Sequence, residues 1–199
     1  MESIEIAGAG FINFRIKSEA IAKKVVEISA KGLDKNPEDS GAKVMVEYTD
    51  PNTFKVFHIG HLMSNAIGES LSRLIEFGGS KVVRICYPSD IGLHIAKSIW
   101  AIRKNPVKMP KDSASIQEKT DFLGRMYVEG TNSYEADQNI KKEIDEINRF
   151  IYDQSDADIN KLFAKGKEWS LEHFELLYKM LDTKFDETIF ESEMAPIGL

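Results

Sequence analysis

The chain has 199 residues, of which 42% are hydrophobic and 29% charged, the composition of an ordinary soluble protein. A formal net charge of −6, with no local basic patch standing out, argues against a chain that binds nucleic acid over its whole surface. No apolar run approaches the roughly 18 residues of a membrane span, the first residues lack a signal-peptide pattern, and a single cysteine excludes internal disulfides. We therefore expect a cytoplasmic protein with no membrane partner.

The N-terminal part predicts a strand, a helix and a linker. Residues 3–16 are predicted to form one strand with a bend, because two glycines interrupt an apolar stretch. Ser18 is a candidate N-cap for a helix with apolar residues at helical spacing, and Gly32 is expected to end that helix. Residues 33–42 contain proline, glycine and several charges, which is typical of a loop or linker.

The pattern then changes to that of a parallel α/β sheet. Residues 43–48 and 82–87 are short apolar runs typical of buried parallel strands, and Cys86 in the second run is expected to be a buried hydrophobe. A long helix is predicted over residues 62–77, ended by two glycines, and a second helix over residues 91–103. Strand, loop, helix and strand in this order form one crossover unit, which builds a parallel sheet.

The rest of the chain is predicted to be mainly helical. Residues 115–155 are helical in pattern, with an apolar stripe that we assign to core packing: Ile140, Ile144, Ile147 and Ile151. A short helix around residues 158–167 and another over roughly 170–181 follow. Residues 185–193 are predicted to form the next strand of the sheet.

The most informative segment is residues 47–61, which ends in the tetrad His58-Ile59-Gly60-His61. The tetrad follows a predicted strand and lies at the start of a predicted helix, where backbone N–H groups and the helix dipole attract phosphate. Imidazoles at this place donate hydrogen bonds to charge that builds on a phosphate during its transfer. Gly60 lets a flat base or sugar lie against the backbone, which a Cβ would obstruct.

The tetrad is also compatible with two roles that involve no phosphate. His58 and His61 share a helix face and so resemble half of a zinc site, but no Cys-x-x-Cys motif or further histidine cluster completes a tetrahedral site, and we expect no bound metal. The other role is that of two incidental residues at a helix start. With four histidines and 13 glycines, a chance His-x-Gly-His is expected in about one such chain in 200.

Together these residues carry a resemblance to a known family. A strand, then Asp50-Pro51-Asn52, a lysine and the tetrad resemble the first signature of class I aminoacyl-tRNA synthetases. Five blocks are similar to arginyl-tRNA synthetases in particular: residues 46–62, 68–74, 89–94 and 185–193 in the catalytic domain, and residues 6–14, similar to the last strand of that family's N-terminal tRNA-recognition domain.

The resemblance implies a fold and a division into domains. The fold class is α/β, an incomplete Rossmann-like parallel sheet of the class I synthetase type with a helical insertion and a short N-terminal remnant of a preceding α+β domain. Residues 1–40 correspond to that remnant and a linker helix, and residues 41–199 to the first half of the nucleotide-binding catalytic domain. We find no second signature loop of the Lys-Met-Ser-Lys-Ser type, so a longer gene product is expected to supply the missing C-terminal half.

The resemblance also implies a reaction. An arginine–tRNA ligase activates L-arginine with ATP, accompanied by Mg²⁺, to arginyl-adenylate and then passes the arginyl group to tRNA(Arg). We expect the isolated fragment to be inactive. Two alternatives remain: a split or truncated chain that acts as a binding or assembly module, and a nucleotidylyltransferase that shares the His-x-Gly-His loop. The loop before the tetrad lacks the Thr-x-Gly-x-Phe-Asp run typical of the latter class.

The resemblance assigns catalytic and ATP-binding roles around the tetrad. His58 and His61 would stabilise the phosphates in transfer, and Gly60 would lie under the adenosine. Lys55, three residues before His58, would reach a phosphate; as a residue of a surface loop it would have no such role. Asp90 is a candidate N-cap for the second helix and, with His94 one turn later, a candidate for shaping the rim of the site.

Arginine recognition needs carboxylates, because a guanidinium binds them through paired, charge-assisted hydrogen bonds. Glu47 at the end of the first strand and Glu191 in the late strand are the matching candidates, with Glu193 a weaker one. The trio Asp50-Pro51-Asn52 would line the arginine site, and His61 would also approach the bound arginine. Many relatives have serine or alanine where this chain has Asp50, so its backbone rather than its side chain is expected to serve.

Overall fold

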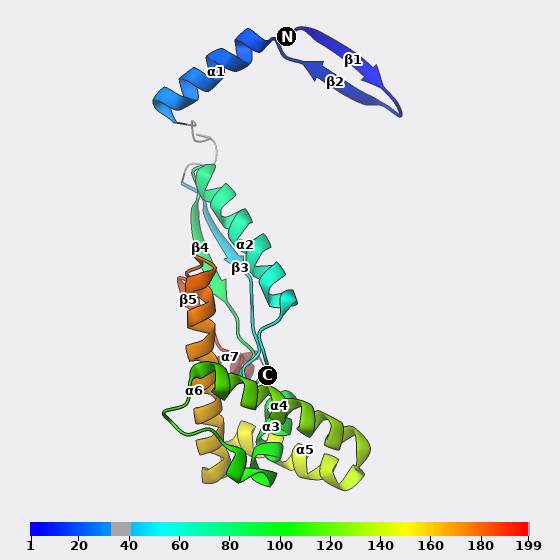
Figure 1. The fold of residues 1–199 in the computed structure, drawn as a ribbon, viewed down its shortest axis with the longest axis vertical. Helices are drawn as coiled ribbons and strands as arrows, with labels where there is room; N and C mark the ends of the chain where they lie inside the picture. Colours follow the sequence, from blue (N-terminus) through cyan, green and yellow to red (C-terminus); the bar gives the residue numbers. More distant parts are fainter. Residues whose placement is uncertain (33–40, 199) are drawn as a thin grey trace.

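The computed structural model describes residues 1–32 and 41–198 (Figure 1). The predicted linker at 33–42 lies largely outside the described residues. The described elements run in the order of an N-terminal hairpin and helix, a parallel α/β unit, a group of helices, and a return to the sheet.

The N-terminal segment forms a hairpin, so the prediction of one bent strand is wrong. β1 (Ser3–Ala7) pairs antiparallel with β2 (Phe11–Arg15), because the backbone reverses at Gly8 and Gly10, both in the left-handed region with φ of 55° and 105°. α1 (Ser18–Lys31) ends at Gly32 as predicted, but Lys17 holds the N-cap position and Ser18 is already helical. Among the described residues, α1 packs against no other helix or strand.

The parallel sheet agrees with the predicted crossover unit. β3 (Lys43–Glu47) pairs parallel with β4 (Lys81–Cys86), which in turn pairs with β5 (Glu187–Thr188), so β4 lies in the middle. Runs of Val, Ile and Met favour the extended backbone of the first two strands. α2 (Ile59–Phe77) connects β3 to β4 and packs on both.

A group of four helices fills the connection between β4 and β5 (Figure 1). It consists of α3 (Leu93–Lys104), α4 (Ile116–Ala136), α5 (Gln138–Asp153) and α6 (Ala157–Met180), with a short 3₁₀ turn at Pro106–Lys108. Ser115 and Glu118 form a reciprocal capping box at the start of α4, and the side chain of Asp137 accepts two backbone N–H bonds at the start of α5. The predicted helical stretch 115–155 is therefore two helices, divided at Asp137.

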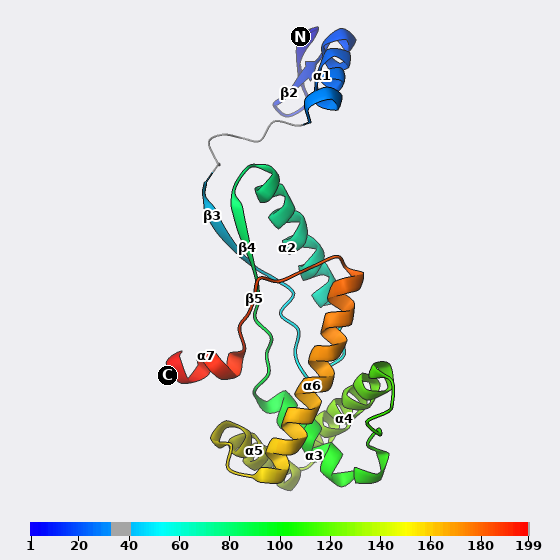
Figure 2. The ribbon, with the colours of Figure 1, turned by 90° about the vertical axis from the view of Figure 1, so that its left-hand side faces the viewer.

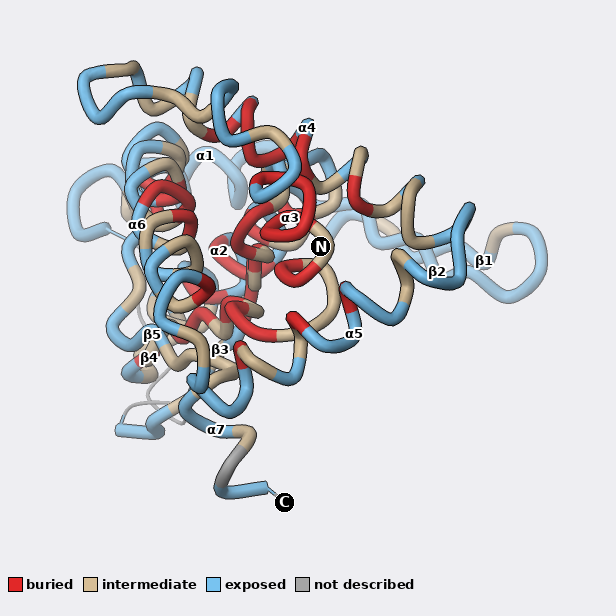
Figure 3. The backbone as a smooth tube through the Cα atoms, turned by 90° about the horizontal axis from the view of Figure 1, so that it is seen from below, coloured by how far each residue is buried: buried red, intermediate tan, exposed pale blue. Residues whose placement is uncertain are grey.

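The main apolar core lies inside this helical region, where Figure 3 shows buried residues on α3 and on stretches of α4 and α6. Ile144, Ile147 and Ile151 are buried and Ile140 packs against them, which confirms the predicted core stripe. The largest side chains of the same core that are almost fully buried are Phe54, Phe122, Leu123, Ile95, Ile99 and Ile159.

Two predictions about the last third of the chain are wrong. α6 is one helix, not two, and Figure 2 shows it extending from the helical region toward the sheet. Gly166 lies within this helix, and the ring of Phe54 packs there in the space that a Cβ would occupy. The predicted strand 185–193 shrinks to the two residues of β5, and Glu191 begins a helix, α7 (Glu191–Gly198).

A second, smaller apolar cluster joins α6 to the sheet. Cys86 is fully buried against Phe174 and Tyr178 of α6, which confirms the expectation for this cysteine. Burial raises the pKa of its thiol to about 11. Within the described residues, none of the helices is long and apolar enough to cross a lipid bilayer.

Candidate active site

The loops that follow β3 and β4 are joined to each other at the carboxyl end of the sheet. Ser89 N donates to Pro51 O (3.2 Å), Thr53 N donates to Ser89 O (3.0 Å), and Asn52 pairs with Ser89 in an isolated parallel bridge. Parallel pairing thus continues beyond the two strands. Ligands of parallel α/β sheets bind at this end of the strands, and Asn52 is fixed there by backbone contacts.

Three residues of the first loop hold a left-handed backbone although none is glycine: Thr49 (φ 79°), Asp50 (φ 43°) and Phe54 (φ 62°). Such conformations cost of order 1–3 kcal/mol each and persist only where the surroundings hold them. Thr49 N donates to Ser64 Oγ of α2 (3.0 Å), and Phe54 N donates to Ser170 Oγ of α6 (2.9 Å). The loop is therefore held from α2 on one side and α6 on the other.

Asp50 uses its side chain inside the protein. Its Oδ1 accepts a hydrogen bond of 2.7 Å from Tyr87 N, the first residue after β4. Burial raises the pKa of this carboxyl, opposed by the Tyr87 bond and assisted by the nearby charge of Glu47. Pro51 next to it is almost fully buried. These two residues shape the loop and hold it to β4.

The two histidines of the tetrad form a reciprocal cap at the start of α2. His58 is the N-cap, and its Nδ1 accepts from Gly60 N (3.1 Å), while His58 N donates to Nδ1 of His61 (3.2 Å). The rings stack with centroids 3.9 Å apart. A neutral imidazole that accepts at Nδ1 carries its proton on Nε2. The cap thus makes each ring an Nε2–H donor at the helix N-terminus.

His61 stays neutral at physiological pH. Only 7% of the residue is exposed, and burial lowers the pKa of its imidazole to about 4, with smaller contributions from the charges of His58 and Lys55. Gly60 is needed for the geometry, because a Cβ there would lie 2.9 Å from Cε1 of the His58 ring. The glycine therefore lets that ring fold back over the helix start.

Lys55 lies in the loop before the tetrad and contacts α4. Its Nζ lies 4.8 Å from the centroid of the Tyr127 ring on α4, and its charge lowers the pKa of both His61 and His94. His94 has a pKa near 4, mainly through burial, and its Nε2 is buried with no hydrogen-bond partner among the described residues.

The two predicted arginine-binding carboxylates lie at the same edge of the sheet. Glu47 is exposed at the end of β3, and Glu191 accepts a hydrogen bond from Ser89 Oγ at the start of α7. Both act on Tyr87 after β4: burial raises the pKa of its hydroxyl, and the charges of Glu191, Asp90 and Glu47 raise it further. Glu191 therefore reaches the site from a helix start, not from the strand that the sequence predicted.

Sequence reasoning assigned Asp90 to the wrong helix. The N-cap of α3 is Gly92, with no side-chain cap, whereas Asp90 is fully buried and binds Ser192 of α7 and Lys167 of α6. Neither partner was identified from the sequence, because they lie 77 and 102 residues away. Nothing in the local sequence around Asp90 indicates these distant partners.

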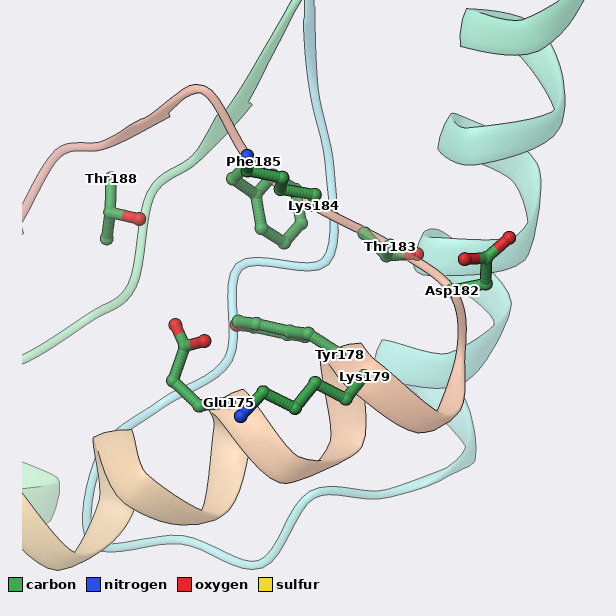
Figure 4. A pocket seen from close by; sticks show the side chains of 8 residues that line it. All are labelled: Glu175, Tyr178, Lys179, Asp182, Thr183, Lys184, Phe185 and Thr188. Carbon is green, nitrogen blue, oxygen red and sulfur yellow. The ribbon is translucent and has the colours of Figure 1, made fainter.

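A pocket lies apart from these residues. It has a volume of about 500 Å³ and lies between the end of α6 and residues 182–188 (Figure 4). Tyr178 and Phe185 meet there edge to face, with ring centroids 5.0 Å apart. None of the predicted site residues lines this pocket, so it is not where the histidines and carboxylates converge.

Over the described residues, no group of three or more His, Cys, Asp and Glu is arranged to hold a metal ion.

Comparison with known proteins places the chain in a family. Residues 24–197 match the family model of the catalytic domain of class I (R) tRNA synthetases. The arginine–tRNA ligase of Bdellovibrio bacteriovorus is 32% identical over 199 residues, which cover 95% of this chain and 33% of that protein. That of Borreliella afzelii is 33% identical over 156 residues, 78% of this chain and 26% of that protein.

The fold has a solved counterpart in the arginyl-tRNA synthetase of Plasmodium falciparum, with a TM-score of 0.59 and 23% identity over 98% of this chain and 34% of that chain. The chain thus spans a third or less of the length of these curated relatives. The family match covers the sheet, the tetrad, the helical region and α7. The chain belongs to the class I tRNA synthetases, to the family of the (R) catalytic domain.

Proposed function

We propose that the protein containing this chain is an arginine–tRNA ligase, and that residues 41–199 form the first half of its catalytic domain, the part that binds ATP and arginine. The observation that carries the proposal is the histidine cap of α2. It sets two imidazole Nε2–H donors at a helix N-terminus and at the carboxyl end of a parallel sheet. The names of the curated relatives support the amino acid and the tRNA.

In the first step, a carboxylate oxygen of arginine attacks the α-phosphorus of ATP. The new O–P bond forms as the bond to the bridging oxygen breaks, and pyrophosphate leaves with Mg²⁺. The neutral His61 and its partner His58 donate to phosphate oxygens through Nε2–H, where charge develops. Lys55, half-buried beside Tyr127, adds a positive charge on the phosphate side. Gly60 would lie under the adenosine once the His58 ring, which folds over it in this structure, turns aside.

Arginine binds at the same carboxyl end of the sheet, on the side of Glu47 and Glu191. Glu47 binds the guanidinium through charge-assisted hydrogen bonds, and Glu191 provides a second carboxylate from α7. Asn52, with Pro51 and the backbone of Asp50, lines the amino-acid site, and His61 approaches the arginine from α2. The exposure of Glu47 and the Ser89–Glu191 hydrogen bond at the same edge support this arrangement.

The second step passes the arginyl group to tRNA(Arg) in the cytoplasm, and it needs the rest of the ligase. We assign residues 1–40 to the end of an N-terminal tRNA-recognition domain and its linker helix. Among the described residues, β1, β2 and α1 contact no element from β3 onward. This lack of contact supports a separate unit. The part of the relatives beyond this chain would supply the remaining catalytic groups, so residues 1–199 alone are expected to be inactive.

The test is arginine-dependent exchange between ATP and pyrophosphate, measured for residues 1–199 and for the full-length ligase. We expect exchange and charging of tRNA(Arg) only for the longer protein. His61→Ala in the longer protein should lower kcat by about 100-fold or more, whereas His173→Ala on α6, outside the site, should not. Exchange that does not depend on arginine would indicate the nucleotidylyltransferase, and a full-length protein without exchange would indicate a binding module.

A further inference from the structure

We propose that Asp90 is a positioning residue for arginine recognition: it holds the start of α7 so that Glu191 faces the substrate edge of the sheet. The inference rests on the proposed function, because it gives a role to the carboxylate of Glu191. Asp90 itself is fully buried and cannot touch substrate. Its effect must pass through the residues that it binds.

Both carboxylate oxygens of Asp90 accept hydrogen bonds from the first turn of α7. Oδ1 accepts from Ser192 N (2.8 Å), and Oδ2 accepts from Ser192 Oγ (2.7 Å). An acidic side chain at a helix N-terminus is favourable, because it satisfies a backbone N–H and faces the positive end of the helix dipole. Asp90 therefore acts as the cap of a helix that begins 101 positions later in the chain, at Glu191.

The residues on either side of these contacts complete the connection. Ser89 Oγ donates to Glu191 Oε2, and Glu191 N donates to Pro88 O (3.3 Å). Ser89 also makes the backbone hydrogen bonds with Pro51 and Thr53 described above. A continuous set of bonds thus runs from the loop of Asn52 through residues 88–90 to Glu191. It fixes the place of the late carboxylate relative to the first loop.

Lys167 offsets the cost of burying the charged carboxylate of Asp90. Its Nζ donates to Asp90 Oδ2 (2.6 Å), and it lies 3.8 Å from the centroid of the Phe190 ring, just before α7. A buried charge that loses its partner is strongly destabilised, whereas removing both members of a pair is often nearly neutral. If Asp90 served only as a partner of Lys167, replacing both residues would remove the defect of the single variant. If Asp90 positions α7, the loss of arginine binding would remain in the double variant.

The first experiment follows amide hydrogen exchange in the 199-residue chain by NMR. Asp90→Asn and Asp90→Ala should increase the exchange of the Ser192 amide at least tenfold, while amides of β4 and α4 keep their protection. Ser192→Ala, which removes only the Oγ bond, is the milder variant if the others fold poorly, and should speed the amides of α7 by a smaller factor. The matched control is Asp112→Asn, in an exposed Asp–Lys pair with Lys165. Unchanged protection at Ser192 would overturn the proposal.

The second experiment measures ATP–pyrophosphate exchange by the full-length ligase. Asp90→Asn should raise KM for arginine about tenfold and leave KM for ATP within twofold, a separation that general destabilisation would not give. Adding Lys167→Met should recover stability, because no unpaired lysine charge remains, but it should leave KM for arginine raised, because Ser192 still lacks the carboxylate of Asp90. Equal losses for both substrates would overturn the positioning role. If the wild-type ligase showed no arginine-dependent ATP–pyrophosphate exchange, the proposed function would be wrong, and with it this role. Amide hydrogen exchange at Ser192 would still test the contact between Asp90 and α7.

Discussion

In the helical region formed by α3–α6 the buried side chains are mainly apolar, whereas α2 turns polar side chains toward its sheet and apolar ones toward solvent. The buried residues of α2 are His61, Asn65, Gly68, Glu69 and Ser72. Its exposed apolar residues follow one another at helical spacing: Ile59, Met63, Ile67, Leu71 and Leu74. One helical region therefore follows the usual rule of amphipathic helices, and the helix that carries the tetrad reverses it.

The contacts of α2 explain how a polar face is held. Glu69 accepts from the hydroxyl of Tyr48 and from the guanidinium groups of Arg73 and Arg84, and Arg84 also binds both oxygens of Glu76. Such bonds are directional, so they fix the position of α2 along β3 and β4 and also stabilise its packing on the sheet. Precise placement of the tetrad therefore depends on this network.

The largest expected effect is in the apolar core. Phe122→Ala removes a ring that is 1% exposed and should destabilise the chain by about 3–5 kcal/mol. Phe77→Ala on α2, where the ring is 47% exposed, is the matched control and should cost much less. Urea denaturation followed by circular dichroism measures both. Equal losses would mean that the two regions do not differ as described.

The polar network of α2 should matter less, but clearly. Glu69→Gln removes the charge shared by Arg73 and Arg84, and the loss of hydrogen bonds to charged groups is worth about 1.5–3 kcal/mol. Tyr48→Phe removes one neutral donor and should cost about 1 kcal/mol. If Glu69→Gln were neutral in the same denaturation experiment, the network would not be what holds α2 on the sheet.

The network should also appear in the pH dependence of stability. Burial alone would raise the pKa of Glu69, but the hydrogen bonds from Tyr48, Arg73 and Arg84 outweigh it, so the pKa is lowered. A lowered carboxylate pKa means that the stabilisation is present above the unfolded value, near 4.5, and is lost as the pH falls through the folded value. Glu76 behaves in the same direction through its bonds to Arg84.

The histidines add a separate window at higher pH. His61 and His94 have folded pKa values near 4 against 6.5 when unfolded, mainly because burial disfavours their charged form. Between pH 6.5 and 4 the unfolded state binds more protons, so stability should fall as the pH falls through this range. His61→Gln should flatten the decline by about 1–2 kcal/mol. A decline unchanged by this substitution would contradict burial of the imidazole.

Local patterns allowed much of the fold to be predicted. The strand, loop and helix around the tetrad, the crossover to β4 and the isoleucine stripe of α5 all depend on neighbours in sequence, and the structure agrees with them. The division of α6 between residues 167 and 170 was wrong: the helix continues through Trp169, which is buried in the core, and Ser170, whose hydroxyl accepts from Phe54 N. Contacts with residues distant in sequence, which a local pattern does not show, thus lie at the point where the break was predicted.

The site shows the same division between local and distant information. Glu47, Asn52 and His61 were brought to one edge by a single crossover, so their proximity follows from the local order of elements. Glu191 accepts a hydrogen bond from Ser89, and its neighbour Ser192 donates to Asp90, each pair about 100 residues apart. The predicted strand failed there, because these contacts cap a helix at Glu191 where alternation alone favoured extension.

The smallest expected effect is on the exposed stripe of α2, and it tests the comparison most directly. Ile67 on α2 is 54% exposed, and Ile144 on α5 is fully buried. The same substitution, isoleucine to glutamine, buries an amide in one place and leaves it in water in the other. Ile67→Gln should change the free energy of unfolding by no more than about 0.5 kcal/mol. Ile144→Gln should cost several times more, because it loses apolar burial and leaves a buried amide to be satisfied.

Thermal and urea denaturation of both variants, with Leu71→Gln as a second change on the stripe, give the comparison. The substitutions on α2 keep the helix propensity nearly unchanged, since Gln ranks close to Leu and Ile in helices. A difference between Ile67 and Ile144 therefore reports burial alone. If Ile67→Gln and Leu71→Gln destabilised the chain as much as Ile144→Gln, the outer face of α2 would be covered in the folded chain, and the contrast between the two regions would not hold.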